Sequence, residues 1–457
     1  MSVESKPRAM EDAPPGPSGE PLFGSSRQYA DDPLSFLEGV ERAYDGVAAF
    51  DMGPMETFVV TDPELVERVL VSDADRFRKP DFQADAIGDL LGDGLLLSEG
   101  ETWREQRGLA NPAFSMARVA GFDEDIVGHA TERVKDWPVG GTVDVEAEMT
   151  HVTLDVILDV MLGVSLPDER VDGIGDALEP VGARFEPDPV RFAAPEWLPL
   201  PDDDEYAAAV ATLDDLVDDI VAAREGTAGE GEPDAGPMDL LSVLLRARDR
   251  GEQPPERLRD EVMTTLLAGH DTTALTLTYT WFLLSEHPEV EARLHEELDD
   301  ALDAGSDPTV EDVQGLDYLD WVIHESMRLY PPVYNIFRTP VEPVDLDGYG
   351  VEPGAPVMLP QWAVHRSADH WEDPAAFDPE RWRPERRADR HRFAYFPFGG
   401  GPRHCIGKHL ALLEAKLIVT TVASDYRLRY EGETPLSFVP SLTMHPEQEL
   451  RMRVEPR

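Results

Sequence analysis

The residue with the most distinctive chemistry is Cys405, the single cysteine of the chain. It follows the glycine-rich stretch Gly399 to Gly401 and precedes a helical pattern that begins after Gly407. The glycines permit backbone conformations that other residues avoid, and they permit close approach of a flat ligand. Free N–H groups at the helix start favour negative charge, so we expect a pre-ionised thiolate that can bind a metal.

One sulfur atom limits the kind of metal site. It cannot supply the thiolates of a zinc or iron–sulfur centre, but it suffices as the axial ligand of a haem iron, where its electron donation favours O–O cleavage. The neighbours of the cysteine stand at spacings that resemble the cytochrome P450 superfamily: Phe398, Gly399, Gly401, Arg403 and Gly407. The resemblance implies a mainly α fold with a small β region, a haem b cofactor and Cys405 as the iron ligand.

A second segment, residues 263–284, is mostly apolar but contains Gly269, Asp271 and Thr272. The glycine would let a flat or bulky group approach the backbone, and the threonine hydroxyl can bond a preceding carbonyl and bend a helix locally. An acid beside an alcohol in an apolar wall suits controlled proton delivery during oxygen activation. By resemblance this is the central helix across the haem face, with Ala268 against the cofactor. An Asp271 held only by a salt bridge is the alternative.

Two charged residues on one helix face, Glu325 and Arg328, form a third motif. Their spacing allows them to pair with each other. Such a pair is usually a solvated surface pair of about 0 to 1 kcal/mol. In the resembling family the matching pair is buried with a further arginine, which corresponds to Arg381. We expect these three residues to support the cysteine loop without touching substrate.

A fourth segment carries Trp103 and Arg107, which lie one helical turn apart on the same face. Together they could hold a carboxylate on an otherwise apolar ring. By resemblance they bind a haem propionate. Arg403 and Arg338 match further propionate partners, although Arg338 could equally be an ordinary surface arginine.

The charge of the chain is extreme, with 92 acidic residues against 40 basic ones and a net charge of −52. Only five of the basic residues are lysines. This balance is typical of adaptation to a salt-rich cytoplasm, because at about 1 M salt the Debye length is about 3 Å and carboxylate repulsion is screened. An ordinary acidic protein is the alternative. Nucleic acid and anionic membranes are unsuited to such a surface.

The organisation of the chain follows from the order of the motifs. Residues 1–27, rich in Pro, Gly and Ser, indicate a disordered leader, and residues 28–457 indicate one haem-thiolate domain. No uninterrupted apolar run of about 18 residues occurs, and neither a signal peptide nor a membrane anchor is recognised, so we expect a cytoplasmic protein.

Hydrophobic periodicity predicts a mainly helical body. Residues 57–60 indicate a strand that ends at a helix start, residues 61–63. Short strands and turns are expected over residues 331–359 and after Tyr430. Residues 225–237, built of Gly, Glu, Asp and Pro, indicate a flexible loop.

No flavin or iron–sulfur module is recognised in the chain, so electrons must come from another protein. We expect a ferredoxin-type donor with its reductase. Residues 381–392 contain six arginines and form the clearest basic segment, here called the basic island. It could dock an acidic ferredoxin near the thiolate side of the haem. Alternatively, its arginines neutralise carboxylates of the protein itself.

The substrate should be apolar, because the candidate contact segments are apolar. These are residues 90–97, Ala268 and residues 442–444. A fatty acid, an isoprenoid or a steroid-like molecule would fit. The leading interpretation is a monooxygenase that inserts one oxygen atom of O₂ into such a substrate, with Asp271 and Thr272 delivering protons.

Three other interpretations remain open at this stage. A peroxygenase or isomerase of the same fold would use the haem differently, and a haem sensor would bind ligand without forming product. A thiol hydrolase would use Cys405 as nucleophile with His324 or His404 as base. The hydrolase leaves Trp103 and Arg107 without a role.

Overall fold

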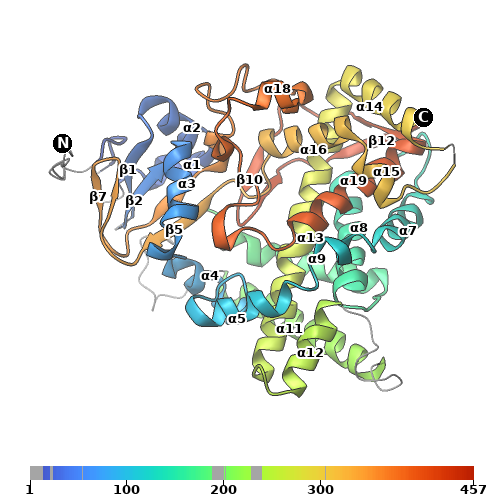
Figure 1. The fold of residues 1–457 in the computed structure, drawn as a ribbon, viewed down its shortest axis with the longest axis horizontal. Helices are drawn as coiled ribbons and strands as arrows, with labels where there is room; N and C mark the ends of the chain where they lie inside the picture. The colour runs from blue at the N-terminus through green and yellow to red at the C-terminus, as the bar shows by residue number, and fades with distance from the viewer. Residues whose placement is uncertain are drawn as a thin grey trace, which may run out of the picture.

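The structure is a computed structural model that describes residues 14–20, 24–53, 55–187, 200, 202–227, 239–303 and 305–457. Helices make up most of the body, and strands gather mainly on one side near the N-terminus (Figure 1). The predicted fold, mainly α with a small β region, is confirmed.

The longer helices surround one hydrophobic core. They are α2 (Pro33–Ala43), α4 (Asp81–Leu91), α5 (Gly100–Ala110), α7 (Asp123–Val134), α8 (Val145–Val156), α9 (Asp168–Ala183), α11 (Asp203–Thr227), α12 (Leu240–Asp249), α13 (Pro255–Glu286), α14 (Pro288–Ala301), α16 (Asp317–Leu329) and α19 (Lys408–Asp425). Shorter helices connect them: α1 (Ser26–Asp31), α3 (Pro63–Glu67), α6 (Met116–Val119), α15 (Val310–Gln314), α17 (Gln361–Val364) and α18 (Pro384–Arg387).

The helix α13 is the axis of the molecule. It is 32 residues long and passes through the middle of the helical body (Figure 1), where it packs on α8, α16 and α19. Residues 273–284 of this helix are all buried. A helix that is apolar on every side is stable only when other elements cover it completely, which explains its central place.

The strands form several small sheets. The largest has the order β1 (Val47–Met52), β2 (Met55–Val60), β8 (Val357–Leu359), β5 (Ile336–Pro340) and β3 (Phe77–Arg78). The others pair β4 (Thr142–Asp144), β12 (Arg451–Pro456) and β9 (Tyr426–Tyr430), then β6 (Val344–Leu346) with β7 (Tyr349–Val351), and β10 (Phe438–Pro440) with β11 (Met444–Pro446). The strand expected at residues 57–60 is the end of β2. Asp62 caps the next helix by accepting the N–H groups of Glu64 and Leu65.

Two segments were predicted to be irregular, residues 1–27 and residues 225–237. Residues 1–13 and 21–23 of the expected leader lie outside the described residues, but Pro15 accepts a hydrogen bond from Ala49 and Gly24 pairs with Met52. This part of the leader is therefore packed on β1. The loop expected at residues 225–237 lies largely outside the described residues. For residues 225–227 the prediction of a loop is wrong, because these residues continue the helix α11.

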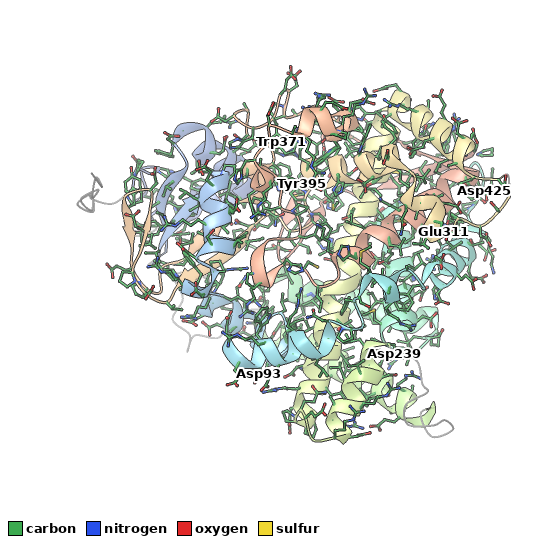
Figure 2. All side chains as sticks on the ribbon, in the orientation of Figure 1. Asp93, Asp239, Glu311, Trp371, Tyr395 and Asp425 are labelled. Carbon is green, nitrogen blue, oxygen red and sulfur yellow. The ribbon has the colours of Figure 1, made fainter. Side chains whose placement is uncertain are left out.

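The predicted scaffold cluster is buried. Arg328 is 0% exposed and donates to both carboxylate oxygens of Glu325, at 2.8 and 2.9 Å. Arg381 donates to the same carboxylate at 3.0 Å, and Trp382 does so through its indole N–H at 3.0 Å. The aromatic residues Trp371 and Tyr395 pack around Trp382 (Figure 2). A paired and hydrogen-bonded carboxylate can be buried. The expected burial of the three residues is confirmed, and their support of the cysteine loop stays a prediction.

Candidate active site

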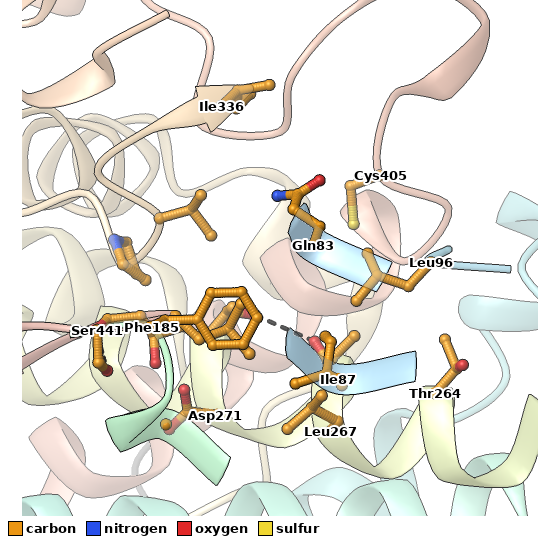
Figure 3. A pocket seen from close by; sticks show the side chains of 18 of the residues that line it. Gln83, Ile87, Leu96, Phe185, Thr264, Leu267, Asp271, Ile336, Cys405 and Ser441 are labelled. Carbon is orange, nitrogen blue, oxygen red and sulfur yellow. Dashed lines mark hydrogen bonds between the residues drawn. The ribbon is translucent and has the colours of Figure 1, made fainter. Parts of the chain in front are cut away.

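A large cavity of about 1650 Å³ opens between α13, the cysteine loop, α4 and the β10–β11 hairpin. Figure 3 shows Cys405 on one side of this space and the α13 residues Leu267 and Asp271 on the other. Cavities for a single organic ligand are usually about 300 to 1,000 Å³. The volume therefore has room for a flat cofactor and a substrate together.

The cysteine loop is held by its own backbone. The Cys405 N–H donates to the Phe398 carbonyl at 3.0 Å, and both Gly399 and Gly401 have positive φ, 66° and 64°. A Cβ at Gly401 would lie 1.9 Å from the Leu70 carbonyl oxygen. The expected left-handed backbone is confirmed, but at Gly401 the close approach is to Leu70 and not to a flat ligand.

The cysteine side chain is exposed to the cavity. Burial raises the pKa of the Cys405 thiol, although N–H groups of Gly407 and Lys408 and the charge of Arg107 act in the opposite direction. The prediction of a pre-ionised thiolate is therefore not borne out for the free side chain. Desolvation outweighs the local dipoles, so the thiolate needs a cation at the sulfur itself.

A group of cations lines the cavity beside the loop. Burial and the neighbouring charges of Arg403 and Arg338 lower the pKa of Lys79 to about 7. Burial and Arg403 lower the pKa of Arg338 to about 10. Within the described part of the chain, neither Lys79 nor Arg338 has a carboxylate in ion-pair range, whereas Arg403 pairs with Glu99. Three crowded cations beside one carboxylate require further negative charge.

The residues Trp103 and Arg107 lie on the cavity wall, as expected. The Arg403 guanidinium stacks on the Trp103 ring at 4.3 Å from its centroid. Arg107 donates to the His404 carbonyl oxygen at 2.9 Å and to its ring Nε2 at 3.1 Å. The structure thus brings together all four residues expected to face propionates, and it adds Lys79, which carried no motif that could have revealed it.

The opposite wall is formed by α13. Ala268 is exposed to the cavity, and the Thr272 hydroxyl donates to its carbonyl oxygen at 3.4 Å. The helix is continuous from Pro255 to Glu286. A Cβ at Gly269 would lie 2.8 Å from Ile157, so the glycine accommodates this side chain. Gly269 also lines the cavity, so the expectation that it lets a flat or bulky group approach the backbone stays a prediction.

Asp271 faces a histidine that the sequence did not indicate. His445 places Nε2 3.5 Å from Asp271 and Nδ1 2.8 Å from Glu146 on α8. Burial would lower the pKa of His445, yet the two carboxylates raise it to about 10. Burial would likewise raise the pKa of Asp271, but His445, His270 and the Thr443 hydrogen bond lower it overall. At neutral pH the site thus holds a protonated imidazole between carboxylates.

Part of the segments predicted to contact substrate lines the cavity. Leu95, Leu96, Leu97, Leu442 and Thr443 line the cavity. Leu90, Leu91 and Met444 are 0% exposed and belong to the core, so their prediction as substrate contacts is wrong. Leu90 and Leu91 are the last two residues of the helix α4, and both are buried there.

A comparison with known families decides the identity. The profile described as cytochrome P450 matches residues 14–451. The chain belongs to the cytochrome P450 family. It is 35% identical over 421 residues to the cyclooctat-9-en-7-ol 5-monooxygenase of Streptomyces melanosporofaciens, covering 90% of this chain and 89% of that protein. It is 30% identical over 448 residues to the pentalenene oxygenase of Streptomyces avermitilis, covering 96% and 97%.

Solved structures agree with the family. The crystal structure of the cytochrome P450DA heme domain superposes with a TM-score of 0.86, at 29% identity, over 98% of this chain and 99% of that one. This P450 is an oxidoreductase of the monooxygenase type, and its family implies a haem-iron cofactor. In the described part of the chain, no helix is long and apolar enough to cross a membrane.

The residues of this P450 fit a haem. A lone thiol faces a cavity large enough for the macrocycle, and the cations at Lys79, Arg338 and Arg403 provide what the two propionates need. The hydrolase interpretation has no geometric support, because His324 is hydrogen bonded to Tyr395 at 2.9 Å and lies away from the cavity lining. His404 bonds to Arg107 and to the Gly401 carbonyl, and within the described residues no histidine is hydrogen bonded to Cys405.

Proposed function

We propose that this P450 inserts one oxygen atom of O₂ into a cyclic terpenoid, with haem b ligated by Cys405 in the single domain of residues 28–457. The observation that carries the proposal is the pairing of a cavity-facing thiol with an apolar wall across one large cavity. Two relatives are named for a cyclic alkenol and for pentalenene, which favours an isoprenoid skeleton over a fatty acid.

The residues around the cofactor would hold it in a fixed orientation. When bound, haem iron supplies the redox chemistry of O₂ activation. Cys405 would ligate the iron, Trp103, Arg107, Arg338, Arg403 and Lys79 would bind the propionates, and Phe398, Gly399 and Ala268 would lie against the ring. The apolar lining keeps water away from the reacting centre.

Proton supply follows the line of polar groups behind α13. Glu146 is partly exposed, with 24% of its side chain accessible, and it bonds to His445. His445 holds a proton beside the ionised Asp271, which can pass it to the Thr272 hydroxyl at the cavity. The 3.4 Å contact of Thr272 with Ala268 is long, so this hydroxyl can turn into the cavity. Asp271 acts here as a relay and His445 as the proton store.

The test of function uses the haem-loaded full chain with a ferredoxin, its reductase, NADPH and labelled O₂. Pentalenene, a tricyclic terpene alcohol and myristate are supplied separately. We expect a terpenoid product that carries one labelled oxygen atom. Equal product from hydrogen peroxide alone would favour a peroxygenase, and substrate binding without product would favour a sensor.

A pH prediction follows from His445. Its pKa is raised in the folded protein, so its pairing stabilises the fold fully below the unfolded value of about 6.5 and is lost as the pH rises through about 10. We expect the difference in melting temperature between wild type and His445→Gln to shrink between pH 7 and pH 10. Thermal scans at constant salt measure it, and a constant difference would contradict the pairing.

The basic island is largely neutralised within the protein. Arg381 is buried in the scaffold cluster, Arg386 pairs with Asp378 at 2.8 Å, and Arg390 stacks on Trp371 at 3.7 Å. Arg383 and Arg392 pair with Glu380 and Glu67. The surface proposed to bind an acidic ferredoxin is therefore smaller than the whole basic island. Its proposed centre is the exposed Arg387 together with the partly paired Arg386.

Replacing Arg386 and Arg387 together by Ser should slow reduction by ferredoxin about 3- to 10-fold at low salt, because rim charges act mainly on association rates. Stopped-flow absorbance of the haem measures this rate. The matched control is Arg250→Ser on the exposed end of α12, on the opposite side of the molecule (Figure 1). An equal rate in both variants would remove the docking role.

We also propose that the protein is adapted to a salt-rich cytoplasm. Acidic residues outnumber basic ones by 92 to 40, and the labelled acids Asp93, Glu311 and Asp425 lie in separate parts of the molecule (Figure 2). Since salt screens their repulsion, raising KCl from about 0.1 to 2 M should increase the melting temperature by on the order of 10 °C. Calorimetry measures this change, with sucrose as a control for general preferential exclusion. A melting temperature that falls with KCl would contradict the proposal.

A further inference from the structure

A tyrosine, a histidine and a carboxylate are linked in a line outside the cavity. His324 Nδ1 lies 2.9 Å from the Tyr395 hydroxyl, and His324 Nε2 lies 3.6 Å from a carboxylate oxygen of Asp320, one turn earlier on α16. The carboxylate favours a hydrogen on Nε2, which leaves Nδ1 as the acceptor and makes the phenol the donor. None of these three residues lines the cavity, so the line takes no part in the proposed binding of substrate or propionates.

Both rings are in the protonation state that proton transfer from Tyr395 requires. Burial raises the pKa of Tyr395 well above its usual value, so the phenol is neutral. Burial also lowers the pKa of His324 to about 4, although Asp320 acts in the opposite direction, so the imidazole is neutral at pH 7 and can take up a proton. Lys416 pairs with the other oxygen of Asp320 at 2.6 Å and holds this carboxylate beside the imidazole.

This arrangement suits the one-electron oxidation of Tyr395. Phenol and indole rings lose an electron more readily than other aromatic side chains. A phenol that has lost an electron is a strong acid, so inside a protein it needs a base in hydrogen-bond contact, and a neutral imidazole is such a base. Tyr279 on α13 is a contrasting case, because its hydroxyl donates to the Met444 carbonyl, which cannot take up the proton.

The chain keeps Tyr395 close to the proposed haem site. It stands three residues before Phe398, which lines the cavity and whose carbonyl accepts the Cys405 N–H. Three residues span at most about 11 Å, so the Cα atoms of Tyr395 and Phe398 are no farther apart than this. An electron from Tyr395 therefore has only a short distance to travel to the cysteine loop.

Tyr395 also belongs to an aromatic cluster that reaches the surface. Its ring centroid is 4.5 Å from that of Trp382, and Trp371 and Trp321 pack in the same cluster (Figure 2). Tyr395 and Trp321 are partly exposed, so an electron donor outside the protein can reach the cluster. The charge of Arg387 acts on Tyr395, which places the proposed ferredoxin-binding patch nearby.

We propose that Tyr395, with His324 as its proton acceptor, forms a redox site that protects the enzyme when activated oxygen meets no substrate. In each step Tyr395 gives one electron to the haem site, and the proton of its broken O–H bond moves to His324 Nδ1. A tyrosyl radical and an imidazolium beside Asp320 result. A one-electron donor at the surface, such as reduced ferredoxin, then refills Tyr395, and His324 returns the proton.

Two such steps supply the two electrons that reduce the remaining oxygen atom to water, with two protons from the solvent. The inference goes beyond the proposed function: it rests on haem ligation by Cys405 but not on the substrate class.

The test mixes the ferric, haem-loaded full chain with a peracid in the absence of substrate and freezes the sample within milliseconds. Electron paramagnetic resonance measures the organic radical. We expect a signal in wild type that narrows when ring-deuterated tyrosine is incorporated. Tyr395→Phe should lower the signal by about tenfold, and so should His324→Gln, which keeps a hydrogen-bond acceptor but cannot take up the proton.

The matched control is Tyr279→Phe, which removes a buried phenol without a base and should leave the signal unchanged. The red-shifted band of the reduced, CO-treated protein shows that each variant is folded and carries haem. An undiminished signal in Tyr395→Phe or in His324→Gln, or no radical in wild type with an intact band, would overturn the redox site. Absence of the band from wild type would instead remove the proposed haem ligation, and the redox site with it.

Protection itself is measured during NADPH oxidation with ferredoxin, its reductase and no substrate. The haem absorbance of Tyr395→Phe should bleach faster per NADPH consumed than that of wild type or Tyr279→Phe. Equal bleaching in the three proteins would contradict a protective role.

Discussion

Replacing Cys405 by Ser should abolish the strongly red-shifted Soret band that the dithionite-reduced, CO-treated protein gives in high-salt buffer. A serine hydroxyl is a poor ligand for haem iron and donates less electron density, so the thiolate spectrum and the monooxygenase activity are lost together. The burial that raises the pKa of the free thiol also predicts that ionisation depends on the bound iron.

The matched control for this substitution is Ile406→Val, which removes one methyl group from the next residue on the cavity wall. It should keep both the spectrum and the activity. Retention of the red-shifted band by Cys405→Ser would show that another group ligates the iron. Absence of haem from folded wild type would revive the thiol hydrolase.

The second large effect is expected at the proton relay. Asp271→Asn and Thr272→Ala should each lower the amount of product formed per NADPH consumed, by up to about 100-fold. The electrons that do not reach product should be recovered as hydrogen peroxide. The reason is that proton delivery, and not substrate binding, is removed. Product yield, NADPH consumption and peroxide are measured in the same reaction, with substrate affinity determined separately.

The control is Thr278→Ala on the same helix. Its hydroxyl is buried, donates to the Ala274 carbonyl at 2.7 Å and lies outside the cavity lining. This variant should remain coupled. Unchanged coupling in Asp271→Asn would assign Asp271 the structural role of a salt-bridge partner of His445, which was the alternative from the sequence.

Local motifs allowed much of this site to be predicted. The cysteine loop, the acid–alcohol pair on α13 and the pair Trp103 and Arg107 are each defined by a few residues close in sequence. Their spacing fixes which side chains share a helix face or a turn, so their local geometry follows from the chain. The buried cluster of Glu325, Arg328 and Arg381 was also expected correctly.

The errors arose where a local pattern has two structural explanations. Gly401 does give close approach, but to the Leu70 backbone. Leu90 and Leu91 are apolar, as a substrate contact would be, but they pack in the core. Composition alone cannot distinguish contact with a ligand from contact with a distant part of the same chain.

The sequence by itself determined the family, the mainly α fold and the acidic composition, and it predicted the thiol ligand, because these depend on residue types and short spacings. The tertiary structure alone placed Lys79 beside Arg403 and Arg338, and His445 between Asp271 and Glu146. These groups acquire their properties from burial and from charges far away in sequence, and neither exists until the chain has folded.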